Sequence, residues 1–165
     1  MIQVVIVRGL QGSGKSTWAK NWVKEDPEHR IRINWDDIRV MMGGEDCYWV
    51  PSREKVPFLN RLMVNMLVTA FDYDINVVID NMNLNPKTIH FIYDIVERFK
   101  HTSGKEIDVF YKNILTPIEE CIVLDAQRDR PIGEKGIRIT ASRYPDYFSE
   151  TDEGTQFLAS VGKKL

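Results

Sequence analysis

The chain has 165 residues and a mass of 19.2 kDa, with 43% hydrophobic residues, which suffices for one self-supporting domain and leaves no room for a second. A net charge of −2 and a pI near 5.9 exclude a basic surface broad enough to coat duplex DNA, so any contact with nucleic acid should be local. The sequence has no long apolar run and no signal-peptide pattern at its start, which predicts a soluble, cytoplasmic protein that does not contact a membrane. The two cysteines, Cys47 and Cys121, lie too far apart to indicate a zinc site or a disulfide framework.

Strand and helix patterns alternate along the chain. Short apolar or β-branched runs predict strands over residues 2–7, 31–35, 75–79 and 107–111. Apolar residues at helical spacing predict helices over residues 15–24, 53–71 and 86–100, the last with Asn85 as N-cap. A capping box formed by Thr116 and Glu119 predicts a further helix that runs to about residue 127. This alternation predicts an α/β fold with a parallel sheet of about four to five strands and helices on both faces.

A phosphate-binding motif follows the first predicted strand and precedes the first predicted helix. The nine residues from Gly9 to Thr17, G-L-Q-G-S-G-K-S-T, match G-x-x-x-x-G-K-[ST] in the strand-to-helix context of a P-loop. Its backbone N–H groups and the helix N-terminus can hold a β-phosphate, Lys15 can reach the β- and γ-phosphates, and the Ser16 hydroxyl can bind Mg²⁺. The residues expected to hold the nucleotide in this motif are Gly9, Gly12, Ser13, Gly14, Lys15, Ser16 and Thr17.

Other nucleotide-binding classes fit the sequence less well. A dinucleotide-binding G-x-G-x-x-G would need glycine where Thr17 stands. Residues 80–83 read D-N-M-N rather than the D-x-x-G of a GTPase, and no N-K-x-D segment follows. An ordinary glycine-rich turn is the remaining alternative to a P-loop, and the four fixed positions of the motif argue against it.

Acidic residues stand where two of the predicted strands end. Because the carboxyl ends of parallel strands share one edge of the sheet, we expect these carboxylates close to the P-loop. Asp36 is a candidate general base for a hydroxyl acceptor, or else an N-cap of the next short helix, a role that Asp37 can take instead. Asp80 is a candidate for Mg²⁺ coordination through water, or else caps the following turn. Arg39, one helical turn beyond Asp36, is a candidate for holding an acceptor phosphate, or an ion-pair partner of Asp36.

Arginines mark the segment after the last predicted helix. Residues 128–137 mix Arg, Pro, Gly and charge, which predicts a lid. Arg128 or Arg130 can neutralise charge on a transferring phosphoryl group, and each can equally be a solvated cation. Tyr48 and Trp49 are candidates for base stacking or for packing near the acceptor side. We expect residues 1–148 to form the domain and residues 149–165 a polar tail.

Three segments together resemble a known family. G-S-G-K-S-T-W-A at residues 12–19, I-N-x-D-D-x-R at 33–39 and N-L-N-P at 83–86, in that order, resemble the kinase domain of the phage-type 5′-polynucleotide kinases. The resemblance spans roughly residues 1–140. It implies a P-loop kinase fold, ATP and Mg²⁺ as cofactors, and transfer of the ATP γ-phosphate to the 5′-hydroxyl end of DNA or RNA.

The resemblance also assigns roles to individual residues. It makes Asp36 the base for the 5′-hydroxyl and Arg39 the ligand of the acceptor's 3′-phosphate. An ungapped alignment makes Arg128 the lid arginine, and a shift of one or two residues makes it Arg130. The sequence departs from the family at Asp80, which stands one place earlier than the family's acidic residue. The family's phosphatase motif D-x-D-G-T is only faintly echoed at residues 151–155, so we expect a kinase without a phosphatase domain, or a kinase domain trimmed from a longer protein.

Two other functions are compatible with the motifs. One is a small-molecule P-loop kinase that phosphorylates a nucleoside, a nucleotide or a sugar derivative. The other is an ATP-gated binding module without phosphoryl transfer. The first shares every residue assignment except that of Arg39, and the second predicts ATP binding without formation of ADP.

Overall fold

The apolar runs predicted as strands pair with one another in one parallel sheet. The structure, a computed structural model, describes residues 1–43 and 52–148. The four strands are β1 (Ile2–Arg8), β2 (Arg30–Ile33), β3 (Asn76–Asp80) and β4 (Ile107–Asn113), and they lie in the order β2-β3-β1-β4. All three strand pairs are parallel, so the carboxyl ends of all four strands lie at the same edge of the sheet.

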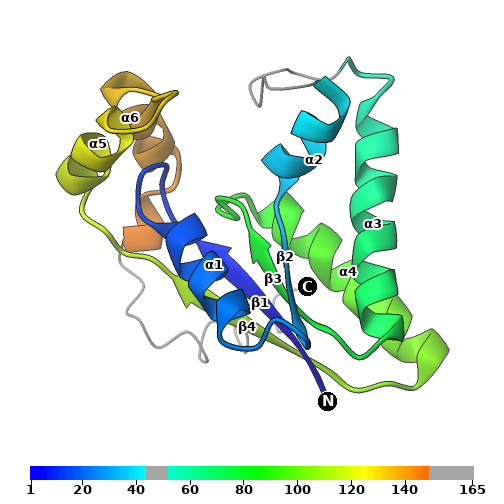
Figure 1. Ribbon diagram of the computed structural model, residues 1–165. Helices are drawn as coiled ribbons and strands as arrows, with labels where there is room; N and C mark the ends of the chain where they lie inside the picture. Colours follow the sequence, from blue (N-terminus) through cyan, green and yellow to red (C-terminus); the bar gives the residue numbers. More distant parts are fainter. Residues whose placement is uncertain (44–51, 149–165) are drawn as a thin grey trace.

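Helices cover both faces of this sheet (Figure 1). Helix α1 (Lys15–Lys24) packs on one face, and α3 (Val56–Asp72) and α4 (Pro86–Ser103) pack on the other. The larger core lies under α3 and α4, where Phe71 and Phe99 meet edge to face with ring centroids 5.3 Å apart. Burial of this apolar surface is the main term that stabilises the sheet, and the predicted α/β fold is confirmed.

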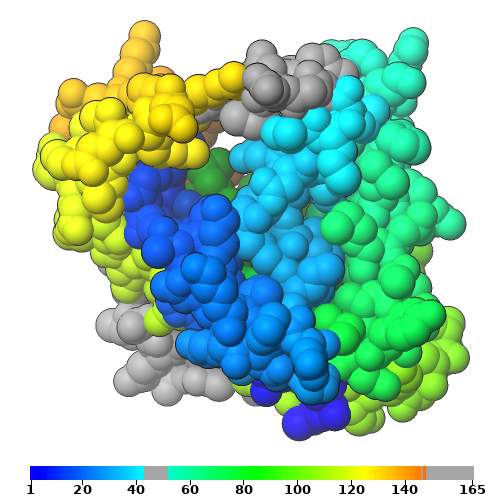
Figure 2. Space-filling view, viewed as in Figure 1, coloured from blue at the N-terminus to red at the C-terminus, as the bar shows by residue number. Residues whose placement is uncertain are grey.

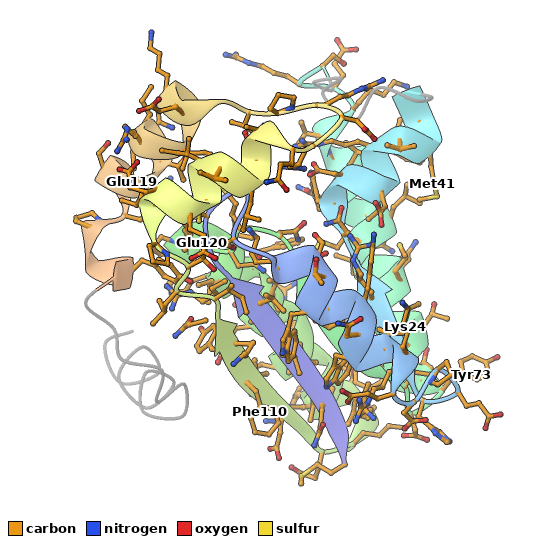
Figure 3. All side chains as sticks on the ribbon, turned by 60° about the vertical axis from the view of Figure 1, so that its left-hand side comes forward. Lys24, Met41, Tyr73, Phe110, Glu119 and Glu120 are labelled. Atoms are coloured by element: carbon orange, nitrogen blue, oxygen red, sulfur yellow. The ribbon has the colours of Figure 1, made fainter. Side chains whose placement is uncertain are left out.

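Helices α2 (Trp35–Gly43), α5 (Ile118–Ala126) and α6 (Glu134–Arg143) lie at the edge of the sheet where the strands end (Figure 1). A short 3-10 helix over Pro145–Phe148 follows α6. Arg138 of α6 pairs with Glu119 of α5 at 2.9 Å and with Glu134 at 2.8 Å, and Figure 3 labels Glu119 at the start of α5. A second, smaller core of Leu10, Cys121, Ile137 and Ala141 joins both helices to the P-loop.

Helix α6 was not expected from the sequence. It begins at Glu134, inside the segment 128–137 predicted as a lid, so the irregular part of that segment ends at Gly133. Its buried residues are Ile137, Thr140 and Ala141, so only one large apolar side chain of this helix faces the core. Within the described residues no helix is long and apolar enough to cross a membrane.

One predicted helix cap is confirmed and another is wrong. The Asn85 side chain accepts a hydrogen bond from the Lys87 N–H at 3.0 Å and begins α4, as expected. Thr116 does not cap α5: no side chain caps that helix, and the Thr116 hydroxyl instead donates to the Ser13 carbonyl at 2.8 Å. Residues 149–165, with the D-x-D-G-T-like stretch, and the pair Tyr48 and Trp49 lie outside the described residues.

Candidate active site

The P-loop joins β1 to α1 and is held from three sides. The Gly9 N–H donates to the Met82 carbonyl at 3.2 Å, which links the loop to the residues after β3. The Ser13 carbonyl accepts from Thr116 at 2.8 Å, and the Gln11 amide donates to the Thr140 hydroxyl of α6 at 3.2 Å. These bonds fix the loop before any ligand arrives, so its amides are preorganised.

Two glycines of the loop have positive φ and differ in their surroundings. Gly12 has φ 75°, and a Cβ there would collide with the Cys121 carbonyl oxygen and lie 3.1 Å from the Asp125 Cβ. Gly14 has φ 94°, and a Cβ there would meet no described atom within 4 Å. Helix α5 therefore packs directly on Gly12, and the space beside Gly14 is open to a ligand.

A polyphosphate fits this open space. The first N–H groups of a helix have no intrahelical partner, and α1 begins at Lys15 beside Gly14. The amides of Lys15, Ser16 and Thr17 consequently point out of the helix end, where the helix dipole favours an anion. Figure 2 shows the surface hollowed at this place, between the yellow lid region and the cyan helix α2.

Lys15 is buried in the loop and lies within electrostatic range of the other candidate residues. Its Nζ donates to the Leu10 carbonyl and approaches the Ser13 hydroxyl at 3.5 Å. Burial lowers the pKa of Lys15 from 10.5 to about 8. The carboxylates of Asp80 and Asp36 oppose this shift of the pKa, and the cation of Arg128 adds to it. Asp80, Asp36 and Arg128 therefore lie within electrostatic range of the P-loop lysine.

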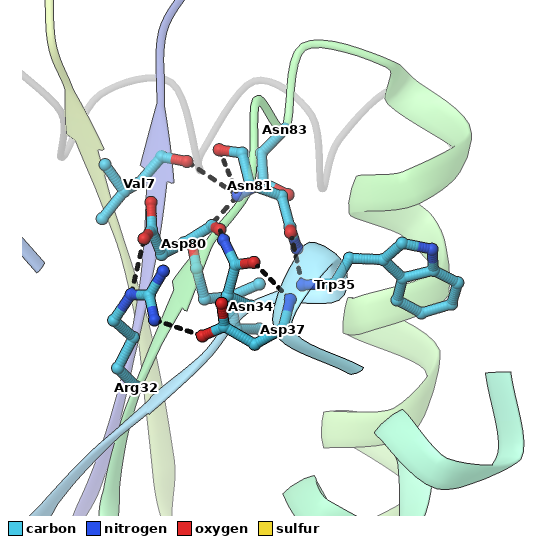
Figure 4. A network of polar contacts seen from close by, with 9 residues as sticks. Val7, Arg32, Asn34, Trp35, Asp37, Asp80, Asn81 and Asn83 are labelled. Carbon is cyan, nitrogen blue, oxygen red and sulfur yellow. Dashed lines mark hydrogen bonds and ion pairs between the residues drawn. The ribbon is translucent and has the colours of Figure 1, made fainter. Parts of the chain in front are cut away.

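Asp80 is almost fully buried at the end of β3 and is paired with Arg32. The Arg32 Nε lies 2.6 Å from Asp80 Oδ2, and its Nη1 donates to Asp37 of α2 (Figure 4). Burial alone lowers the pKa of Arg32, but the hydrogen bonds and charges of these two carboxylates raise it above its ordinary value. The other oxygen of Asp80, Oδ1, is buried without a hydrogen-bond partner among the described residues.

This orphaned oxygen fits a hydrated magnesium ion. Mg²⁺ prefers oxygen ligands and keeps several waters, using few protein groups when phosphates also bind it. The hydroxyl of Ser16 is exposed at the start of α1, and Asp80 Oδ1 is a free acceptor. No group of three or more His, Cys, Asp or Glu is arranged as a closed metal site in the described ranges, so a metal here would depend on the nucleotide as well.

Asparagines hold the strand ends together and begin α2 beside the P-loop (Figure 4). Asn34 donates to the Asp80 carbonyl, and its Oδ1 accepts the Asp37 N–H at 3.0 Å, as an N-cap of α2. Asn81 accepts the Trp35 N–H at 2.9 Å, and Asn83 donates to the Val7 carbonyl at 2.7 Å. The cap of α2 is therefore Asn34, and the alternatives that Asp36 or Asp37 caps this helix are wrong.

Asp36 lies in the first turn of α2 with an exposed side chain. Its Oδ1 is 3.2 Å from Arg39 Nη1, and the side chain of Asp36 is 62% exposed against 31% for Arg39. The predicted ion pair of these two residues is thus present in the protein. Such an exposed pair is weak, so an incoming acceptor can separate it.

The lid arginines follow α5. Arg128 Nη1 lies 3.1 Å from Oδ1 of Asp125, while half of the Arg128 side chain stays exposed. Arg130 lies two residues further in the same exposed loop, and it also has an interaction partner. The charge of Arg128 adds to the lowering of the Lys15 pKa.

The sequence reasoning missed two charged residues of this region. Arg32 lies in β2 and pairs across the sheet, and Asp125 lies on the inward face of α5 with 1% exposure. Asp125 stands four residues after the buried Cys121, so helical spacing placed it on the same face. Leu124, the residue before Asp125, is 38% exposed.

Comparisons with known proteins agree with this architecture. Residues 4–134 match the family AAA_33, described as an AAA domain. No curated protein matches the sequence.

Solved structures share the fold at low sequence identity. A chain of the Pnkp1/Rnl/Hen1 RNA repair complex superposes with a TM-score of 0.67 and 21% identity, covering 92% of this chain and 46% of that chain. A second structure of a Pnkp1/Rnl/Hen1 complex gives 0.63 and 22%, covering 78% and 40%. This chain therefore spans less than half of the length of these two proteins. The APS kinase CysC of Mycobacterium tuberculosis, in complex with AMPPNP and APS, gives 0.51 and 19%, covering 76% and 69%.

The motif, the strand order and the match to residues 4–134 lead to one assignment. The chain belongs to the AAA_33 family and has the P-loop kinase fold.

Proposed function

We propose that the protein transfers the γ-phosphate of ATP to the 5′-hydroxyl end of DNA or RNA. The observation that supports this function is the grouping of an exposed carboxylate, Asp36, and a lid arginine, Arg128, around the buried P-loop lysine, Lys15. Phosphoryl transfer to a hydroxyl needs these three groups: a cation on the phosphates, a base at the acceptor and a second cation over the transferring group.

The P-loop residues bind the donor in this proposal. Amides from Gly12 to Thr17 and the Lys15 ammonium hold the β- and γ-phosphates. Ser16 and Asp80 Oδ1 would hold Mg²⁺, Asp80 through water. When bound, the ion would supply positive charge to the phosphates. Arg32 occupies Oδ2 of Asp80 and leaves the other carboxylate oxygen for this role.

Asp36 accepts the proton of the attacking hydroxyl. Its exposure suits an acceptor that arrives from solvent at the end of a long chain, and Arg39 stands beside it to hold the acceptor's 3′-phosphate. Transfer of Arg39 from Asp36 to this phosphate frees the carboxylate to act as the base. Arg128 then neutralises charge on the γ-phosphoryl oxygens, and Arg130 contacts the nucleotide from the same loop.

The comparisons support the nucleic-acid acceptor in one respect and leave room for an alternative. The likeness to a chain of an RNA repair complex, together with the I-N-x-D-D-x-R and N-L-N-P segments, favours a nucleic-acid end. The likeness to an APS kinase favours a small-molecule acceptor, in which case Arg39 would not hold a 3′-phosphate.

The test is transfer of labelled γ-phosphate from ATP with Mg²⁺ to four acceptors offered in parallel: 5′-hydroxyl DNA, 5′-hydroxyl RNA, nucleoside 3′-monophosphates and free nucleosides. We expect label on the oligonucleotides and the 3′-monophosphates. Label on free nucleosides alone, unchanged by Arg39→Ala, would establish the small-molecule alternative.

A matched pair of variants tests the base. Asp36→Asn should lower kcat by about 10²–10⁴-fold because general-base assistance is lost while the side chain keeps its size. The control is Asp94→Asn, which changes an equally charged, exposed residue on α4 and should leave turnover unchanged. Near-normal turnover of Asp36→Asn would remove Asp36 from the mechanism.

A further inference from the structure

Helix α5 carries a buried carboxylate that the proposed reaction does not use directly. Asp125 is 1% exposed, and an ionised carboxylate is buried only where hydrogen bonds and an opposite charge compensate for the lost water. A neutral side chain of similar size would fill the same place without this cost. The partners of Asp125 therefore indicate what the charge does.

Both partners of Asp125 belong to the lid loop. Its Oδ1 lies 3.1 Å from Arg128 Nη1, and its Oδ2 accepts the Gly133 N–H at 2.8 Å. Arg128 begins the loop and Gly133 ends it, directly before α6. One carboxylate thus closes the loop at both ends.

The same residue lies against the P-loop. A Cβ at Gly12 would lie 3.1 Å from the Asp125 Cβ and would collide with the Cys121 carbonyl one helical turn earlier. The base of the lid and the phosphate-binding loop are consequently in direct contact. Arg128, held by Asp125, lies within electrostatic range of Lys15.

We propose that Asp125 is a positioning residue whose carboxylate holds the Arg128 guanidinium beside the P-loop, oriented toward the phosphoryl group that is transferred. This inference rests on the proposed function. One nitrogen of Arg128 is bound to Asp125, and half of the side chain remains exposed, so other N–H donors are available to phosphate oxygens. Fixing the orientation in advance lowers the entropic cost of reaching the transition state.

Two substitutions separate this role from simple support of the loop. Asp125→Asn keeps an oxygen that can accept the Gly133 N–H and loses the charge that holds Arg128, whereas Asp125→Ala loses both. We expect Asp125→Asn to fold, to lower kcat about tenfold and to leave the KM for ATP within twofold. The control Asp129→Asn removes the same charge from an exposed neighbour in the loop and should change kcat less than twofold.

A double-mutant cycle tests whether Asp125 acts through Arg128. In an Arg128→Gln background, Asp125→Asn should change kcat less than twofold, since the group that it positions is already gone. An equal tenfold loss in that background would overturn the proposal. A kcat equal to or above that of the wild type in Asp125→Asn alone would also overturn it, because Asp125 would then restrain Arg128 rather than present it.

A second readout does not depend on turnover. The ordering of the Arg128 Nε–H group, measured by NMR relaxation in the whole chain, should fall in Asp125→Asn and stay unchanged in Asp129→Asn. The Gly133 amide should keep its protection from hydrogen exchange in Asp125→Asn and lose it in Asp125→Ala. If the wild type transfers phosphate to no acceptor, the proposed function fails. The NMR measurement of Arg128 ordering still shows in that case whether Asp125 holds this side chain. Unchanged Arg128 ordering in Asp125→Asn would overturn the inference whatever the activity.

Discussion

Replacement of Lys15 by methionine should remove a pH-dependent destabilisation of the protein without ligand while it abolishes ATP binding. Lys15 is charged at neutral pH in both the folded and the unfolded chain, but burial in the P-loop disfavours the charged form and lowers its pKa from 10.5 to about 8. Each pKa unit corresponds to about 1.4 kcal/mol. The folded wild type therefore carries a penalty of roughly 3 kcal/mol at pH 7 that Lys15→Met removes.

The pH dependence of this penalty has a definite sign. The folded state releases the Lys15 proton near pH 8, and the unfolded state near 10.5. Between these values the unfolded chain binds more protons, so the Lys15 contribution makes the free energy of unfolding rise with pH in this window. Below pH 8 the penalty is nearly constant, and above 10.5 it vanishes. The advantage of Lys15→Met over the wild type should thus shrink by about 2 kcal/mol between pH 7 and pH 9.5.

Urea denaturation of both proteins across this range measures the difference. The variant also loses the hydrogen bond from Lys15 to the Leu10 carbonyl, which costs roughly 1–3 kcal/mol and does not depend on pH. The change with pH, rather than the difference at one pH, is accordingly the diagnostic quantity. Lys20→Met on the exposed face of α1 is the control. If the difference between Lys15→Met and the wild type stayed constant from pH 7 to pH 9.5, the assignment of a depressed pKa to a buried P-loop lysine would be refuted.

Two further substitutions test contacts that hold the site together. Gly12→Ala should cost at least about 2 kcal/mol and lower Tm by at least ~4 °C, because it combines a positive φ with a collision against a backbone carbonyl of α5. Gly104 also has a positive φ, but a Cβ there meets open space, so Gly104→Ala should lose only the free energy of the strained backbone. Equal losses of Tm in the two variants would contradict the contact between Gly12 and the Cys121 carbonyl. Arg32→Gln should lower the free energy of unfolding by about 3 kcal/mol, since it leaves the buried Asp80 unpaired. Arg138→Gln breaks only exposed pairs and should cost less than about 1 kcal/mol, and a similar effect of both arginine variants in urea titrations would show that the Asp80 pair is not buried in solution.

The sequence predicted those parts of the protein whose signals are local. The P-loop is contiguous in sequence, and its glycines, lysine and hydroxyls lie between β1 and α1, where the motif places them. The strands were found because burial on both faces leaves continuous apolar runs, and α4 because Asn85 and Pro86 mark its start. The grouping of Asp36 and Asp80 near Lys15 followed from parallel topology alone.

The charged partners within the site were not predictable in this way. Arg32 and Asp80 are 48 residues apart, and only the register of β2 on β3 decides that they meet. Thr116 carries a valid capping-box pattern, yet its hydroxyl is directed to the Ser13 carbonyl of the P-loop, and no side chain caps α5. Local propensity loses to tertiary contacts at these positions, which all border the phosphate-binding loop.

The burial of Asp125 follows from the helical phase of α5. Once Cys121 is taken as buried, the residue four positions later must face the same way, and an acidic side chain there conflicts with an apolar core. Such a conflict persists in a folded protein only where a partner compensates for it, and here the compensation comes from the loop that carries the lid arginine. Arg32 at Asp80 repeats the arrangement at the end of β3. In both places a buried carboxylate is paired with an arginine, so these charged pairs are part of the fold before a nucleotide binds.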